Sequence, residues 1–276
     1  MTVPKSGYAD VKDVRLYYEI DGKGSDLVFV HAGCADRRMW DKQFSAFASD
    51  YRVLRYDMRG YGKSSLSTTP FSNRDDLYHL LEVLGIQHAY FVACSMGSLA
   101  AIDFALEHPE KVKSLVLVSP ALSGYEYQEP PPQPVLEMIE ARKAGNLEHA
   151  AELQAQLWAD GPKRNSGQAN REVHESVHQM SLDSLRLQED IIRETAFLLE
   201  EPLNPPAIER LEQVTVPTLA IVGDLDDDSE MAIADVLTTR VKGAKKVIVN
   251  EAAHLLNMEK PEEFNQIVLE FLNEIN

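Results

Sequence analysis

Short apolar runs alternate with longer amphipathic stretches along most of the chain. In the clearest run, residues 115–118, apolar side chains occupy consecutive positions, which is typical of a strand that is covered on both faces. Runs of this kind predict buried parallel strands over residues 27–31, 52–56, 90–94, 114–118, 217–222 and 246–249. An antiparallel hairpin is expected before them, over about residues 8–20.

Helical patterns lie between these runs. They predict helices over about residues 75–84, 97–107, 229–240 and 261–275. The last of these begins at Pro261, a residue type that the first turn of a helix accepts. Strands that alternate with helices in this way indicate a doubly wound α/β fold with a mostly parallel sheet.

One long segment, residues 124–211, breaks the alternation and shows no convincing strand. A proline-rich stretch at 130–134 opens it, prolines at 202–206 close it, and helical patterns lie between. We therefore expect a helical lid inserted into an α/β core whose two parts are residues 1–123 and 212–276. Most apolar side chains of the lid are expected to pack the lid itself, and a minority to face a pocket beneath it.

Composition narrows the class of protein. The 276 residues carry a formal net charge of −17, which would repel a nucleic-acid backbone or an anionic membrane, so neither is an expected partner. No stretch approaches the roughly 20 apolar residues of a membrane span, and the first residues lack the pattern of an export signal. Cys34 and Cys94 are too few for a disulfide framework. We expect a soluble cytoplasmic protein with free thiols, and its oligomeric state stays open.

Ser95 stands between the predicted strand at 90–94 and a predicted helix. A sharp turn between a strand and a helix exposes its central side chain, and it needs small residues two positions before and two positions after. Ala93 and Gly97 meet this need around Ser95, whereas a turn centred on Cys94 would place larger side chains at both positions. The register therefore favours Ser95 as a nucleophile over Cys94, and over a serine that only caps the helix.

A serine nucleophile needs a base, and the base needs a carboxylate that holds it in one tautomer. Of eight histidines, His254 follows the last predicted strand and precedes the last predicted helix, so it should lie on a loop at a strand end. The strand at 217–222 ends at Gly223, where an acid is expected. The residues leave its register open among Asp224, Asp226, Asp227 and Asp228.

Two further turns bear on the chemistry. Residues 31–34, His-Ala-Gly-Cys, follow a predicted strand, and their backbone N–H groups, with that of Met96, are candidates for binding a developing oxyanion. The turn at residues 57–65 contains Gly-x-Gly but lacks the third glycine and the following helix of a dinucleotide fingerprint. We interpret it as structural and expect no nucleotide.

Together these segments resemble the α/β-hydrolase superfamily, in particular its lid-bearing branch of esterases, lactonases and carbon-carbon-bond hydrolases. Similar segments span about residues 26–121 and 215–272 and leave only the lid unmatched. They are, in chain order, His31-Ala32-Gly33, Asp57 to Ser64, Ala93 to Gly97, Gly223 to Asp226, and His254 before Lys260-Pro261-Glu262-Glu263-Phe264. The chain departs from the family where glycine is frequent, at Ala32, Ala93 and Ala252.

The resemblance implies that Ser95 is the nucleophile, His254 the base and then the acid, and Asp226 its orienting carboxylate. It also implies that Gly33 and Met96 supply the oxyanion-hole amides. The expected activity is acyl-enzyme hydrolysis of a small, largely apolar ester or lactone, without metal or organic cofactor, and a carbon-carbon bond or a thioester is the alternative. Relatives that open epoxides or carbon-halogen bonds carry Asp as nucleophile, so Ser95 argues against both activities.

Two other classes of function compete with this interpretation. Residues 174–178, His-Glu-Ser-Val-His, match a zinc-protease pattern that places two imidazoles on one helix face. The five ordered segments outweigh this pentapeptide, so we expect His174 and His178 to belong to a polar helix face. The second competitor is a protein that keeps the fold and only senses a ligand. An intact set of serine, histidine and aspartate argues against a purely non-catalytic role.

Overall fold

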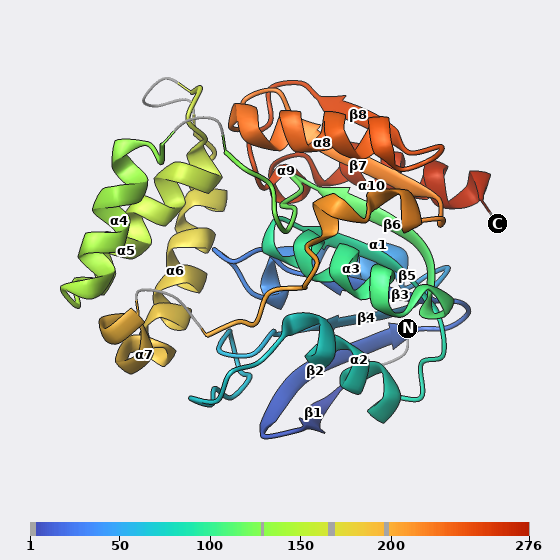
Figure 1. Cartoon of the computed structure of the whole chain (residues 1–276), viewed down its shortest axis with the longest axis horizontal. Helices are drawn as coiled ribbons and strands as arrows, with labels where there is room; N and C mark the ends of the chain where they lie inside the picture. The colour runs from blue at the N-terminus through green and yellow to red at the C-terminus, as the bar shows by residue number, and fades with distance from the viewer. Residues whose placement is uncertain (1–3, 128–129, 165–168, 196–198, 276) are drawn as a thin grey trace.

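An eight-stranded sheet forms the centre of the molecule, of which the computed structural model describes residues 4–127, 130–164, 169–195 and 199–275 (Figure 1). The strand order is β1-β2-β4-β3-β5-β6-β7-β8. The strands are β1 Lys5–Val11, β2 Val14–Gly22, β3 Asp26–Val30, β4 Arg52–Tyr56, β5 Ala89–Cys94, β6 Val112–Val118, β7 Thr218–Gly223 and β8 Lys245–Val249.

The pairing of the strands confirms the predicted hairpin and the mostly parallel sheet. β1 pairs antiparallel with β2, and β2 antiparallel with β4. From β4 to β8, every neighbouring pair is parallel. The sheet is therefore parallel throughout the part that carries the candidate site residues.

β8 differs from its prediction. The apolar run at 246–249 predicts a buried strand, but β8 is the edge of the sheet and Ile248 is 45% exposed. An apolar run does not reveal whether a strand is central or marginal, because this depends on which strands pair beside it. The prediction of burial at this strand is wrong.

Helices cover both faces of the sheet (Figure 1). α2 (Asn73–Val83), α3 (Met96–Glu107) and α8 (Asp228–Arg240) contribute to the core on one face, and α1 (Asp41–Phe47) and α10 (Pro261–Glu274) to the core on the other. The sequence predicts four of them and misses α1, which is too short to display a helical period. α1 is held by burial of Phe44 and Phe47 against the sheet.

A second layer of helices, here called the cap helices, comes between β6 and β7 and lies beside the sheet in Figure 1. They are α4 Gln133–Lys143, α5 Leu147–Gln154, the π-helical η3 Ala155–Asp160, α6 Arg171–Leu187 and α7 Glu189–Thr195. α4 to α7 share an apolar cluster of their own, which includes Ala151, Leu182 and Leu185. Among the described residues, no helix combines the length and apolarity that crossing a bilayer requires.

The candidate site residues follow the carboxyl ends of the parallel strands. Gly33 comes after β3, Ser95 after β5, Asp226 after β7 and His254 after β8. Parallel strands point the same way, so these loops meet at one edge of the sheet. The cap helices supply the opposite wall, as the cavity described below shows.

Candidate active site

Ser95 occupies the turn between β5 and α3 with φ 52° and ψ −117°, a strained conformation for a residue with a side chain. Its N–H donates to the carbonyl of Val118 at 2.9 Å, and its own carbonyl accepts from Ser98 Oγ at 2.6 Å. Gly97 lets α3 approach β3, because a Cβ there would lie 2.6 Å from the carbonyl oxygens of Val30 and His31. This is the backbone shape that the sequence predicts for a nucleophile turn.

The three alanines that replace glycine fit without backbone strain. Ala32, Ala93 and Ala252 are fully buried. In the part of the chain that the structure describes, the non-glycine residues with positive φ are Lys12, Ser95, Ser119 and Glu251, so none of the three alanines is among them. Glycine's left-handed conformations are not needed at these positions.

Asp226 is the member of the aspartate run that contacts His254. Nδ1 of His254 lies 3.0 Å from each carboxylate oxygen of Asp226. Asp227 instead caps α8 by accepting from Ser229 N at 2.9 Å, and Asp228 pairs with Lys163. The geometry therefore selects one register among those that the sequence leaves open.

Burial and mutual attraction oppose each other in this pair. Burial alone would lower the pKa of His254, but the charge and hydrogen bond of Asp226 outweigh it and raise that pKa above its usual value. Burial would likewise raise the pKa of Asp226, but His254 holds it below the usual value. Glu230 is a nearby third titratable group, whose pKa burial raises to about 7. The carboxylate is thus set to stabilise a protonated imidazole.

Ser119, which follows β6, helps to hold His254 and Asp226 in place, and the sequence analysis does not identify it. Its Oγ donates to the carbonyl oxygen of His254 at 2.8 Å, and its hydrogen bonding also contributes to the lowered pKa of Asp226. Ser119 has φ 43° and directly follows β6. Its place at a strand end is the signal that would have found it.

A cavity of about 200 Å³ lies between the loops of Ser95 and His254 and the cap helices. Nε2 of His254 is buried and has no hydrogen-bond partner within the described part of the chain, so this nitrogen is available to take up a proton. The cavity is smaller than the roughly 300–1,000 Å³ of usual small-molecule sites. Its lining residues are Gly33, Cys34, Tyr61, Ser95, Met96, Met138, Arg142, Gln154, Trp158 and His254.

Gly33 and Met96, the candidate oxyanion donors, lie next to each other. A Cβ built on Gly33 would meet Sδ of Met96 at 3.3 Å. Met96 is the first residue of α3, so its N–H belongs to the first turn, whose amides have no partner within the helix. An anion at this point also meets the positive end of the helix dipole.

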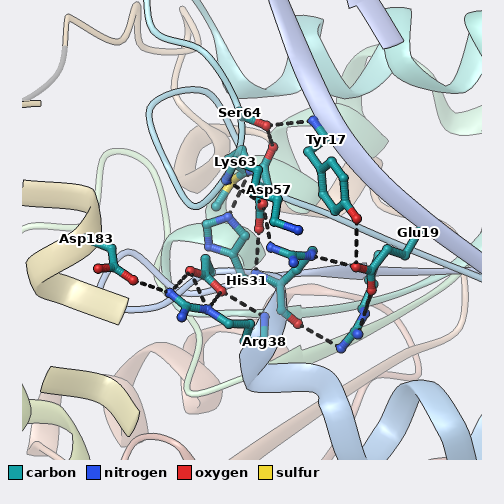
Figure 2. Close-up of polar contacts among 12 residues, drawn as sticks. Tyr17, Glu19, His31, Arg38, Asp57, Lys63, Ser64 and Asp183 are labelled. Carbon is teal, nitrogen blue, oxygen red and sulfur yellow. Dashed lines mark hydrogen bonds and ion pairs between the residues drawn. The ribbon is translucent and has the colours of Figure 1, made fainter. Parts of the chain in front are cut away.

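His31 supports the loop that carries Gly33 (Figure 2). Its Nδ1 lies 2.8 Å from the carbonyl oxygen of Ala32, and its Nε2 lies 2.9 Å from the N–H of Met58. Nε2 must accept from that amide, so Nδ1 carries the proton and donates. Burial lowers the pKa of His31 to about 4, which keeps this tautomer neutral.

The Gly-x-Gly turn folds around the carboxylate of Asp57, as Figure 2 shows. Asp57 accepts from Lys63 N at 2.9 Å, from Arg37 N at 3.0 Å and from Arg37 Nη1 at 2.8 Å. A Cβ at Gly62 would lie 2.4 Å from the same carboxylate, which explains the second glycine. The carboxylate of Asp57 therefore occupies the inside of the turn, which supports the interpretation of the turn as structural.

Polar contacts hold α6 against the loop around Gly33. Ser181 Oγ donates to the carbonyl oxygen of Cys34 at 2.8 Å. Arg38 bridges Asp36 of the core and Asp183 of α6, with Nη2 2.8 Å from Asp183 Oδ2 (Figure 2). The candidate oxyanion loop therefore rests on the cap helices as well as on the sheet.

A buried ion pair holds the end of η3 against the loop of His254. Arg164 pairs with Glu259 and donates to the carbonyl oxygens of Asp160 at 3.0 Å and Glu251 at 3.1 Å. Glu259 in turn accepts from Ala253 N at 2.9 Å. The sequence signals neither residue, because the pair joins positions 95 apart in the chain.

The zinc-protease pattern lies on α6 with its histidines turned to carboxylates of neighbouring cap helices. His174 Nδ1 is 2.9 Å from Asp160 Oδ1, its Nε2 is 3.3 Å from Glu152, and His178 Nε2 is 3.8 Å from Glu148. No three His, Cys, Asp or Glu side chains among the described residues are arranged to hold a metal ion. These contacts form the polar helix face that the sequence predicts.

Comparison with known proteins shows the family of the chain. The family model for the α/β-hydrolase fold matches residues 27–261. A 2-hydroxy-6-oxononadienedioate/2-hydroxy-6-oxononatrienedioate hydrolase of Burkholderia vietnamiensis is 28% identical, over 95% of this chain and 92% of its own length. A 3-oxoadipate enol-lactonase of Acinetobacter baylyi is 25% identical, over 90% and 89%.

The fold agrees with solved structures as well. The crystal structure of the enol-lactonase from Burkholderia xenovorans superposes with a TM-score of 0.77 at 23% identity, covering 97% of this chain and all of that one. At this identity the likeness shows the fold. It extends across the cap helices as well as the sheet, since nearly the whole chain is covered.

Proposed function

The chain belongs to the α/β-hydrolase family, and we propose that it hydrolyses a small, largely apolar ester or lactone through an acyl-enzyme on Ser95. One observation carries the proposal: the strained Ser95 and the pair of His254 with Asp226 line or adjoin a single small cavity. The lining residues Met138 and Trp158 come from the cap helices, which supports a lid over residues 124–211.

The first half of the reaction transfers the acyl group to the enzyme. Ser95 Oγ attacks the carbonyl carbon while its proton moves to Nε2 of His254. The oxyanion that forms accepts hydrogen bonds from the amides of Gly33 and Met96, and removing one such donor costs about 3 kcal/mol of transition-state stabilisation. His254 then gives the proton to the departing alcohol oxygen as the carbonyl re-forms.

Water completes the reaction in the second half. His254 takes a proton from water, whose oxygen attacks the acyl carbon, and the proton passes to Ser95 Oγ as the acid leaves. Asp226 keeps the charge of the imidazolium stabilised through both halves. None of these steps calls on a metal or an organic cofactor.

The relatives support this chemistry in general and divide over the bond that is broken. They include a lactonase and a hydrolase named for an oxo-dienedioate substrate. A carbon-carbon bond or a thioester remains the alternative on the same three residues, because each of these substrates presents a carbonyl to the serine. A panel of short acyl esters, lactones, thioesters and vinylogous diketones would rank these bonds by kcat/KM.

Covalent labelling tests the nucleophile. A phosphonyl or sulfonyl fluoride should form one adduct per chain on Ser95, with activity lost in parallel. Ser95→Ala should lose both, while the neighbouring Cys94→Ala should keep both, since burial raises the pKa of the Cys94 thiol well above its usual value. Intact mass and peptide mapping give the readout.

Two results would contradict the proposal. Turnover that survives Ser95→Ala and disappears in a chelator would assign the chemistry to a metal. A labelled Ser95 in a protein that turns over no member of the panel would instead indicate a ligand sensor built on the hydrolase fold. We expect full activity after dialysis against a chelator.

A further inference from the structure

Gln154 places an amide group in the wall of the cavity that holds Ser95 and His254. It is the last residue of α5, it is only 3% exposed, and it lines the cavity. Among the described residues, no side chain or backbone group forms a hydrogen bond with its side-chain amide. Packing does not seal that amide off either, so it faces the open space of the cavity.

The other two buried glutamines in the described part of the chain are held by the backbone. Nε2 of Gln43 donates to the carbonyl oxygen of Asn257 at 3.1 Å, and Nε2 of Gln188 donates to that of Gly60 at 2.8 Å. Gln154 makes no such bond, although it is as deeply buried as Gln188. A buried amide without a partner is destabilising, and a ligand group that pairs with it offsets this cost. The amide is therefore better explained by a bound molecule than by the packing of the cap helices.

The helix that carries Gln154 changes its winding at this point. α5 continues directly into the π-helical η3, and π-helical turns are rare overall and are often found at functional sites. Trp158 of η3 lines the same cavity, and its ring centroid is 6.5 Å from that of His254. Residues four positions apart lie on one helix face, so Gln154 lies about one turn along the wall from Trp158. One wall of the cavity thus presents an apolar ring beside the base and an amide one turn away.

We propose that Gln154 determines specificity by hydrogen-bonding an uncharged polar group of the substrate, a hydroxyl or a carboxamide, a few carbons from the reacting carbonyl. This inference rests on the proposed function of the same cavity and adds the substrate class. The glutamine amide donates through Nε2 and accepts at Oε1, so it pairs with a group that does both. The side chains of Met138 and Trp158 fit the hydrocarbon between that group and the carbonyl.

Gln154 itself carries no charge, which determines the kind of group that it can hold. A hydrogen bond to a neutral amide compensates the desolvation of a hydroxyl or a carboxamide, but alone it does not compensate that of a buried ion. The net charge of −17 also disfavours the approach of anions. The size of the cavity, about 200 Å³, limits the hydrocarbon between the polar group and the reacting carbonyl to a short chain.

Pairs of substrates that differ in one polar group test the proposal. In the acyl half, methyl 6-hydroxyhexanoate is compared with methyl heptanoate, and methyl 5-carbamoylpentanoate with methyl 6-methylheptanoate. In the alcohol half, 4-hydroxybutyl butyrate is compared with pentyl butyrate. The measured quantity is the ratio of kcat/KM for the polar ester to that for its apolar isostere, followed by pH-stat, because this ratio cancels a general loss of activity.

Two variants separate the cavity amide from a glutamine on the outside of the same helical segment. Gln154→Met keeps the shape of the side chain without its hydrogen bonds, so it should lower the ratio by roughly 5- to 50-fold in at least one pair. Gln156→Met makes the same change at an exposed residue of η3, whose Nε2 donates to Glu152 at 2.7 Å, and should leave every ratio unchanged. The pair that responds identifies the polar group and the half of the ester that carries it. Ratios that stay the same in Gln154→Met for all pairs would overturn the proposal.

Thermal stability distinguishes recognition from a structural role. An amide that has no partner in the free protein loses no hydrogen bond when a thioether replaces it, so Gln154→Met should keep or raise the melting temperature. Gln43→Met removes the bond to Asn257 and should lower it. A melting temperature that falls in Gln154→Met as much as in Gln43→Met would show that the amide serves packing, and this result would also overturn the proposal.

A binding measurement distinguishes this inference from the proposed function. Calorimetric titration of Ser95→Ala with the same pairs of esters needs no turnover. Preference for the polar ester that disappears when Gln154→Met is added supports the inference, even if the wild type hydrolyses none of the esters and the proposed function fails. Ester turnover and a Ser95 adduct without a preference that depends on Gln154 would leave the function standing and defeat the inference.

Discussion

Two histidine-aspartate pairs in this molecule have nearly the same contact geometry and lie in different surroundings. At the strand ends, His254 Nδ1 is 3.0 Å from both carboxylate oxygens of Asp226. In the cap helices, His174 Nδ1 is 2.9 and 3.0 Å from those of Asp160. The difference lies at the other ring nitrogen. Nε2 of His174 is 3.3 Å from Glu152, whereas Nε2 of His254 has no hydrogen-bond partner among the described residues and adjoins the cavity of Ser95.

Under the proposed function, this comparison separates a histidine that a carboxylate only holds from one that can also act as a base. A base needs a nitrogen that is free to exchange a proton and a nucleophile beside it. It also needs a carboxylate whose field is not screened by water, and Asp226 is almost fully buried while Asp160 is not. The same substitution in the two pairs should therefore have very different consequences.

The largest difference is expected when each aspartate becomes an amide. Asp226→Asn should lower kcat by about 10⁴-fold, because the amide cannot stabilise the imidazolium and favours the wrong tautomer. Asp160→Asn should lower it less than about tenfold. Steady-state kinetics on one ester and a thermal melt of each variant give the comparison.

The aspartate run supplies an internal control for this experiment. Asp224→Asn removes a charge two residues away and should have a much smaller effect than Asp226→Asn. Equal losses for Asp226→Asn and Asp160→Asn would mean that both pairs serve the same structural purpose. A larger loss in Asp224→Asn would assign the orienting acid to Asp224.

The dependence of activity on pH should follow His254 and ignore His174. His254 must be neutral to accept the serine proton, and the charge of Asp226, with smaller contributions from Glu230 and Asp227, raises its pKa above the ordinary value of about 6.5. The acidic limb of kcat/KM should therefore have its midpoint above that value and fall tenfold per pH unit below it. Asp226→Asn should move the limb to lower pH, and His174→Gln should leave it in place.

If the midpoint of the acidic limb in the wild type lies at or below the ordinary pKa of histidine, the assignment of a buried, carboxylate-paired base is contradicted. A limb that moves with His174→Gln would place the titrating group in the cap helices. Glu230 is another group near the pair with a shifted pKa, so Glu230→Gln shows how much of the profile belongs to that acid.

The sequence predicts the order of strands and helices well because local patterns determine them. Ser95 and His254 also follow from such patterns, since each stands beside an apolar run that becomes a strand. The exposure of β8 could not be predicted, because a strand's place at the edge of the sheet depends on the pairing of strands far apart in the sequence. The short α1 could not be predicted for a related reason. It is stabilised by the packing of Phe44 and Phe47, and its seven residues are too few to display a helical period of apolar positions.

The contacts that support the site could not be predicted from local sequence patterns. Arg164 meets Glu259, and Ser181 meets Cys34, across long stretches of chain, so no spacing in the sequence connects them. The residues alone leave the register of the acid open, and the distance between Asp226 and His254 favours Asp226.

The smallest expected effect concerns the stability that the cap pair provides. Burial would lower the pKa of His174, but the hydrogen bonds and charges of Asp160 and Glu152 outweigh it, so the folded-state pKa lies above the unfolded one. A raised pKa means that the protonated ring stabilises the fold below the unfolded value of about 6.5. This stabilisation is lost as the pH rises through the folded-state pKa.

His174→Gln should therefore lower the free energy of unfolding at pH 5.5 and have almost no effect at pH 8.5. The pair is partly exposed, so screening by water limits the loss at pH 5.5 to about 1 kcal/mol. Urea denaturation of wild type and variant at both pH values measures it, with His178→Gln, whose nitrogen is 3.8 Å from Glu148, as the weaker-contact control. A loss that is larger at pH 8.5 would reverse the sign expected from a raised pKa, and stabilisation of the wild type by added zinc that both variants abolish would give these two histidines the metal site that their sequence pattern suggested.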